Sequence, residues 1–165
     1  MMIRGFTFLE LLLVLLFSFL ALTAGVPSFQ SIVQTGKMTR LATDIQGFMF
    51  QARAEAITRN QDLWAHIIIA EGGENTGQWS IQLTDAVEGG ELIALLSGSP
   101  YKNINIAANY TSNQISFDGI NGKAKSGNLT FSSGEGTLKF ISFRLSGRMR
   151  ICGDGGDYYG YKSCS

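Results

Sequence analysis

The N-terminal stretch from Phe6 to Val26 constrains the fold most, because it is mainly apolar and only one of its residues, Glu10, is charged. At about 1.5 Å per residue, a helix of these 21 residues would be about 30 Å long, the thickness of a bilayer core. A short leader precedes the stretch, and its single charge, Arg4, favours a cytoplasmic N-terminus. The sequence therefore predicts a transmembrane helix over residues 6–26.

Glu10 is unusual in such a segment, because an ionised carboxylate in hydrocarbon costs ~3 kcal/mol or more unless it is paired. One alternative is a secretory signal peptide, since Ala21 to Ala24 loosely resemble a cleavage site, and another is an ordinary membrane anchor. Neither alternative explains the carboxylate. Cleavage between Gly5 and Phe6 would explain it, because the new α-amine of Phe6 in one subunit could neutralise Glu10 of a neighbour.

The run Gly5-Phe6-Thr7-Phe8-Leu9-Glu10, followed by the apolar stretch, resembles the class III signal of type IV pilins and type II secretion pseudopilins. The resemblance implies that residues 1–5 are a leader peptide, which a prepilin peptidase removes before it methylates the amine of Phe6. It also implies a single-pass protein of the bacterial inner membrane, with a cytoplasmic N-terminus and a periplasmic head. Subunits would leave this pool to join other pilins in a pilus or pseudopilus, with Phe6 and Glu10 as the assembly contact.

Residues 27–60 continue the helix as an amphipathic second half. Apolar residues recur at spacings of four, three, four and four, which is one face of a helix: Leu41, Ile45, Phe48, Ala52 and Ala56, with Met38 and Met49 beside them. The opposite face carries Lys37, Arg40, Arg53 and Glu55. We expect the helix to end near Arg59 and its apolar face to pack against the C-terminal domain.

Residues 61–165 are expected to form the head. Short apolar stretches alternate with glycine-containing turns, and the chain has 20 Gly but only 2 Pro. We count seven or eight strands, with residues 138–151 as the longest β-like stretch. No second helical pattern appears, which predicts a sandwich or a partly closed barrel packed on the helix.

The sequence indicates no enzyme, no cofactor and no metal site. The only histidine, His66, stands beside the apolar run 67–69, and we expect a structural imidazole rather than a ligand or a base. The chain has 2 Cys and 1 His, too few for a zinc site of nearby ligands. It shows no recognisable nucleophile motif, and its carboxylates are scattered over predicted loops.

The neutral total charge hides a basic C-terminal third. Residues 60–120 carry seven acids and one base, whereas residues 123–165 carry seven bases and three acids. If residues 143–152 form one strand, Arg144, Arg148 and Arg150 share its solvent face, and Lys162 and the tail tyrosines could lie nearby. Guanidinium groups for phosphates and tyrosines for stacking suit DNA. A solvated strand face without a ligand is the alternative.

Residues 115–122, the stretch 129–132 and the ending Gly147-Arg148-Met149-Arg150-Ile151-Cys152 resemble the GspH/FimT subgroup of minor pilins and pseudopilins. The resemblance implies an α+β fold, with a long N-terminal pilin helix, transmembrane in its first half, packed on an antiparallel two-sheet β head. It also implies that Gly147, Arg148 and Arg150 form the GRxR pattern with which FimT-type pilins bind double-stranded DNA for natural transformation. The rival is a structural minor pilin or type II secretion pseudopilin that primes or caps filaments, with its arginines against acidic neighbours.

Cys152 and Cys164 are predicted to form a disulfide, because a head outside the inner membrane lies in an oxidising compartment. The bridge would hold the Gly- and Tyr-rich tail between them in a compact shape. Two reduced, buried thiols are the alternative.

Overall fold

A computed structural model describes residues 7–164 of the chain, and for residues 24–28 it describes the backbone only. The chain divides into two compact units, Met1–Gly36 and Lys37–Ser165. One helix, α1 (Phe8–Arg59), supplies the described secondary structure of the first unit and begins the second. It ends where the sequence predicted, because Asn60 takes a left-handed φ of 51° and Gln61 N–H donates to the Ala56 carbonyl at 3.2 Å.

Among the residues described, no helix combines the length and the apolar character that crossing a membrane requires. The membrane-spanning role of residues 6–26 stays a prediction.

Up to residue 164, the head contains eight strands in two antiparallel sheets of four. The first sheet has the order β3-β2-β1-β5, with bounds Leu92–Ser97, Trp79–Thr84, Leu63–Ile69 and Gln114–Phe117. The second sheet has the order β4-β6-β7-β8, with bounds Asn105–Asn109, Gly127–Ser133, Gly136–Phe143 and Arg148–Gly153. A short 3-10 helix, Thr111–Asn113, precedes β5.

One apolar core joins the second part of α1 to both sheets. The predicted helix face is confirmed, because its residues are all buried: Met38, Leu41, Ile45, Phe48, Met49, Ala52 and Ala56. Ala42, which was not predicted, is buried with them. Alternate strand residues complete the core, as in β1, where Leu63, Ala65 and Ile67 face inward. Truncating a core residue such as Leu41 to alanine should cost roughly 2–5 kcal/mol of folding stability.

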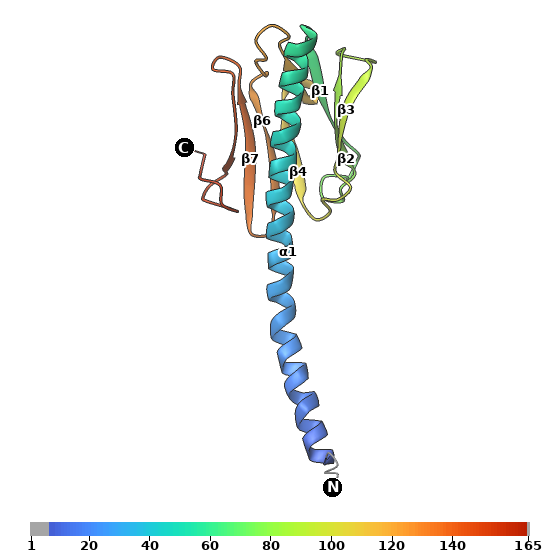
Figure 1. The fold of residues 1–165 in the computed structure, drawn as a ribbon, viewed down its shortest axis with the longest axis vertical. Helices are drawn as coiled ribbons and strands as arrows, with labels where there is room; N and C mark the ends of the chain where they lie inside the picture. The colour runs from blue at the N-terminus through green and yellow to red at the C-terminus, as the bar shows by residue number, and fades with distance from the viewer. Residues whose placement is uncertain (1–6, 165) are drawn as a thin grey trace, which may run out of the picture. The chain divides into compact units, whose positions relative to one another are not determined.

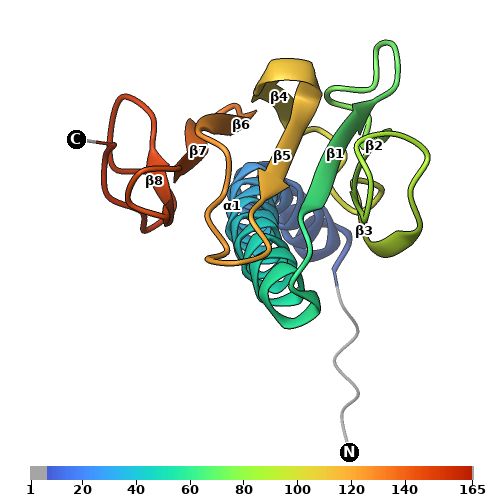
Figure 2. The same ribbon diagram turned by 90° about the horizontal axis from the view of Figure 1, so that it is seen from above.

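The predicted α+β class with a two-sheet head is confirmed. Figures 1 and 2 show the two sheets side by side along the part of α1 that belongs to the second unit, each with one face toward the helix. The helix, rather than a second stacked sheet, thus supplies the facing layer that a predicted sandwich would need. The outer face of each sheet is left at the surface of the head.

Candidate functional site

The predicted processing and assembly residues stand at the start of the chain. Gly5 and Phe6 lie outside the described residues. Glu10 lies exposed in the first turn of α1, where a carboxylate complements the helix dipole, and its N–H donates to the Thr7 hydroxyl at 3.3 Å. Large apolar side chains between residues 8 and 22 are 46% to 78% exposed. Apolar surface of this extent is typical of a segment that lipid or a partner covers.

The basic C-terminal segment is a β-hairpin and not the single strand predicted over residues 143–152. β7 ends at Phe143, β8 begins at Arg148, and residues 144–147 form the turn between these paired residues. The apolar-polar alternation continued through Leu145 and hid this turn, although Leu145 is 96% exposed. Arg144 therefore lies in the turn, where its N–H donates to Ser126 Oγ at 2.9 Å, and not on the strand face with the other two arginines.

Arg148 and Arg150 lie on the outer face of β8, because Met149 between them is buried on the inner face. Arg148 is exposed and pairs in register with Phe143 of β7, and Arg150 is half-buried opposite Ile141. Two residues along a strand separate their Cα atoms by ~6.6 Å, close to the spacing of neighbouring phosphates. β8 is an edge strand of its sheet, so these side chains stand at the border of the head.

Strand charges are confined to this sheet. Its four strands carry Lys139, Arg148 and Arg150 and no Asp or Glu, whereas the four strands of the other sheet carry no Asp, Glu, Lys or Arg. Lys139 forms an ion pair with Asp154 at 2.9 Å. The outer face of the second sheet is therefore cationic, and its charge concentrates on β8.

Gly147, which starts the GRxR pattern, is buried in the hairpin turn with a left-handed φ of 65°. Arg53 of α1 donates a hydrogen bond from Nη1 to the Gly147 carbonyl at 3.2 Å. A Cβ atom added to Gly147 would lie 3.5 Å from Lys123 Cγ and 3.9 Å from Arg53 Nη2. Side chains from the helix and from the loop after β5 thus meet at one glycine of the hairpin turn. Sequence reasoning missed this, because Arg53 and Gly147 are 94 residues apart and no local pattern links them.

The loop after β5 is tied by Asp118. Its carboxylate accepts backbone N–H bonds from Ile120 at 2.9 Å and from Asn121 at 3.0 Å. These hydrogen bonds, with the positive charges of Arg144 and Lys123, hold the pKa of the Asp118 carboxyl below its ordinary value of 3.8. Asp118 is therefore an anion at neutral pH and partly offsets the cations around Gly147.

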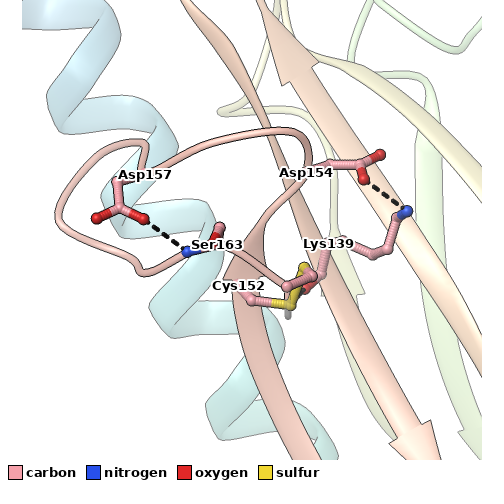
Figure 3. Close-up of a disulfide and its surroundings, with 6 residues drawn as sticks. Lys139, Cys152, Asp154, Asp157 and Ser163 are labelled. Carbon is pink, nitrogen blue, oxygen red and sulfur yellow. Dashed lines mark hydrogen bonds and ion pairs between the residues drawn. A yellow bond between two sulfur atoms is a disulfide. The ribbon is translucent and has the colours of Figure 1, made fainter.

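The predicted disulfide is confirmed. Cys152 in β8 and Cys164 near the end of the chain are joined by an S–S bond of 2.04 Å (Figure 3). The loop that it closes is held further by the pair of Lys139 with Asp154 and by a hydrogen bond of 2.8 Å from Ser163 N–H to the Asp157 carboxylate. The tail is thus a folded part of the head.

The tail lies at the opposite end of β8 from Arg148. The Lys162 carbonyl accepts a hydrogen bond from Gly153 N–H. The Lys162 ammonium lies 3.6 Å from the Asp157 carboxylate. Along a strand, Gly153 is ~17 Å from Arg148, so the structure does not bring Lys162 to the arginines. The tail tyrosines, Tyr158, Tyr159 and Tyr161, are half-buried against the core, which leaves less of their rings for base stacking than the sequence suggested.

His66 lies half-buried on the outer face of the first sheet. Its Nε2 is 2.8 Å from Thr84 Oγ1 and 3.3 Å from the Ala86 carbonyl. These contacts suit the structural imidazole that the sequence predicts. Over residues 7–164, no group of His, Cys, Asp and Glu is arranged to hold a metal ion.

Comparisons with known proteins point to one family. The family model of the type II transport protein GspH matches residues 41–158. Two crystal forms of the type IV minor pilin FimU of Pseudomonas aeruginosa share the fold, each at 12% identity, with TM-scores of 0.57 and 0.55. The matches cover 74% and 73% of this chain and 96% and 99% of the FimU chains. At this identity the likeness supports the fold alone. No curated protein sequence matches the chain.

Proposed function

Because the chain belongs to the GspH family and is a minor pilin or pseudopilin, we propose that it binds double-stranded DNA with the β7–β8 hairpin. In this proposal the filament is a type IV pilus, and the bound DNA is extracellular DNA captured for natural transformation. One observation carries the proposal: Arg148 and Arg150 stand on the outer face of an edge strand, in a sheet whose strands carry no carboxylate.

Two properties of this surface support a phosphate ligand. Guanidinium groups donate to phosphate oxygens in a fixed fork geometry, and the spacing of Arg148 and Arg150 suits successive phosphates. Contacts of this kind position a duplex without reading its sequence, so the expected binding is strong at low salt and largely independent of sequence.

The test measures DNA binding of the full-length chain in a non-ionic detergent, over a range of salt concentrations. The double variant Arg148→Ala with Arg150→Ala should bind far more weakly, and the slope of log affinity against log salt, measured at low salt, should shrink by about two contacts, roughly 1.8 units. The matched control removes two exposed cations from elsewhere, Arg40→Ala with Lys102→Ala, and should keep both affinity and slope. If the double variant binds as the parent does, the hairpin is not the DNA site.

A structural role is the second candidate function, and the charge distribution favours it. The stretch 60–120 has seven acids against one base, so its loops could receive the arginines of a neighbouring head in a pilus or pseudopilus. Under this alternative, the parent protein shows no DNA shift at low salt, and the double arginine variant assembles poorly. In a host bacterium, DNA binding predicts the reverse: normal filaments with reduced DNA uptake.

Processing and membrane insertion belong to the same proposal. The exposed apolar residues between 8 and 22 would be covered first by the lipid of the inner membrane and then by neighbouring helices in the filament. A prepilin peptidase would cut between Gly5 and Phe6 and methylate Phe6, whose amine would neutralise Glu10 of a neighbour. Mass spectrometry of the membrane-extracted protein should find N-methylated Phe6 at the N-terminus. Recovery of an intact Met1, or of a cut near Ala24, would contradict this scheme.

A further inference from the structure

The cations at the tip of the hairpin come from three segments that are far apart in the sequence. The turn and the start of β8 supply Arg144 and Arg148, the loop after β5 supplies Lys123, and α1 supplies Arg53. Arg53 and Lys123 both lie close to Gly147. The positive charges of Lys123 and Arg144 both lower the pKa of the Asp118 carboxyl, so these two side chains share a neighbourhood as well. Figure 2 shows the loop after β5 running beside α1, in agreement with these contacts. We call Arg53, Lys123, Arg144 and Arg148 the tip cluster.

Within the tip cluster, Arg53 has a positioning role. Its side chain is half-buried, and its guanidinium is committed to the Gly147 carbonyl at 3.2 Å. Gly122, in the loop after β5, comes so close that an added Cβ would lie 2.8 Å from Arg53 Cγ. The Arg53 side chain is therefore held between the two loops and fixes the hairpin turn relative to the loop after β5.

Lys123 is placed differently, since its side chain is half-exposed and covers Gly147 from the loop side. Both backbone polar groups of Lys123 are hydrogen-bonded: its N–H donates to Asn121 Oδ1 at 3.0 Å, and its carbonyl accepts from Asp118 N–H at 3.1 Å. The stem of Lys123 thus starts from a rigid loop beside Gly147, the residue that precedes Arg148. A preorganised cation loses less conformational freedom when it binds an anion than a mobile one does.

Resting on the DNA-binding function proposed above, we infer that Lys123 is a further phosphate-binding residue and that Arg53 positions the hairpin for it. The surface then runs from β8 across the hairpin turn to the loop after β5. The tip cluster has four cations, whereas Asp118 and Asp62 supply two carboxylates at the loop after β5, so its local charge suits a polyanion. A duplex lying across this surface would contact phosphates from two segments instead of one strand.

The experiment compares Lys123→Gln with Lys125→Gln in the full-length chain, using a labelled DNA duplex at several salt concentrations. Lys125 is the matched control, since it lies two residues away but its ammonium donates to the Thr111 carbonyl at 3.0 Å. Loss of one phosphate contact should weaken binding roughly eight-fold at 0.1 M salt and lower the salt slope by about 0.9. Lys123→Arg keeps the charge and should keep the parental slope.

The outcomes separate this inference from the function on which it rests. If Lys123→Gln matches Lys125→Gln in affinity and slope while the Arg148 and Arg150 double variant loses binding, Lys123 is not part of the site. If the double arginine variant also binds normally, the proposed function itself fails. Arg53→Lys keeps the charge but shortens the donor fork, so we expect an unchanged slope with weaker binding. A parental affinity in that variant would remove the positioning role.

Discussion

Replacing Gly147 with alanine tests whether the GRxR turn depends on a backbone conformation that only glycine adopts readily. Gly147 has a φ of 65°, and a left-handed residue with a side chain costs about 1–2 kcal/mol. The nearest atoms to an added Cβ lie 3.5 and 3.9 Å away, which is ordinary van der Waals contact, so sterics add little. Alanine also restricts the unfolded chain, which returns about 0.4–1 kcal/mol. The net loss of stability should be about 1 kcal/mol.

A glycine-to-alanine variant at a second position isolates the free-energy cost of the left-handed backbone conformation. Gly134, in the turn between β6 and β7, has no left-handed φ, and an added Cβ would meet nothing within 4 Å. Replacing Gly134 with alanine restricts the unfolded chain to the same extent, but it does not force a side chain into the left-handed conformation. The difference in unfolding free energy between the two variants should therefore equal the left-handed cost alone, about 1–2 kcal/mol.

Urea unfolding of both variants in non-ionic detergent, followed by far-ultraviolet circular dichroism, measures this difference from the midpoints at equal slope. The same Gly147→Ala protein should bind DNA more weakly, because a relaxed turn re-aims Arg148. Equal midpoints for the two variants would refute the argument that residue 147 must be glycine for its backbone. Unchanged DNA affinity together with a real loss of stability would show that the turn does not position the arginine.

Three other outcomes follow from the structure. Cys152→Ser with Cys164→Ser opens a covalent loop with a sequence separation of 12, so the free energy of unfolding should fall by about 3 kcal/mol in a thermal or urea denaturation; an unchanged midpoint would refute this. Burial raises the pKa of Tyr110 to about 12, so its contribution to stability is complete below pH 10 and is lost as pH rises toward 12. Alkaline titration of Tyr110→Phe against the parent should show one fewer late-ionising phenol by ultraviolet absorbance. Glu10→Ala should stop subunits from entering filaments, which sedimentation of sheared fibres would detect; normal incorporation would contradict the assembly contact.

The periodicity of apolar residues was sufficient to predict the helices and strands that bury one regular face. The spacing of Leu41, Ile45 and Phe48 predicted the helix face, because a helix presents every third or fourth residue to its core. Alternation predicted strands such as β2, where Trp79, Ile81 and Leu83 are buried. The Cys152–Cys164 disulfide followed from the compartment that the pilin signal implied. Each of these features depends on local sequence or on compartment.

The hairpin tip could not be predicted in this way. Leu145 continued the strand alternation into a turn, and only Ser146 and Gly147 signalled the reversal. The contact of Arg53 with Gly147 joins residues far apart in the chain, and a polar helix face gives no sign of which loop will cover it. The tail tyrosines were equally ambiguous, since amphipathic rings serve a core edge as readily as a base stack.

The disulfide also has a mechanical consequence. An edge strand near the end of a chain is usually the first to peel away when tension is applied, because few backbone bonds hold it and its terminus is free. Here Cys152, within β8, is linked covalently to Cys164, so residues 152–164 form a closed ring that stays attached to β8. Force on a ligand held at Arg148 enters β8 beside the hairpin turn and is carried by the six residue pairs that join β8 to β7. Under such a load the bridge keeps the tail loop closed even where its hydrogen bonds to β8 open.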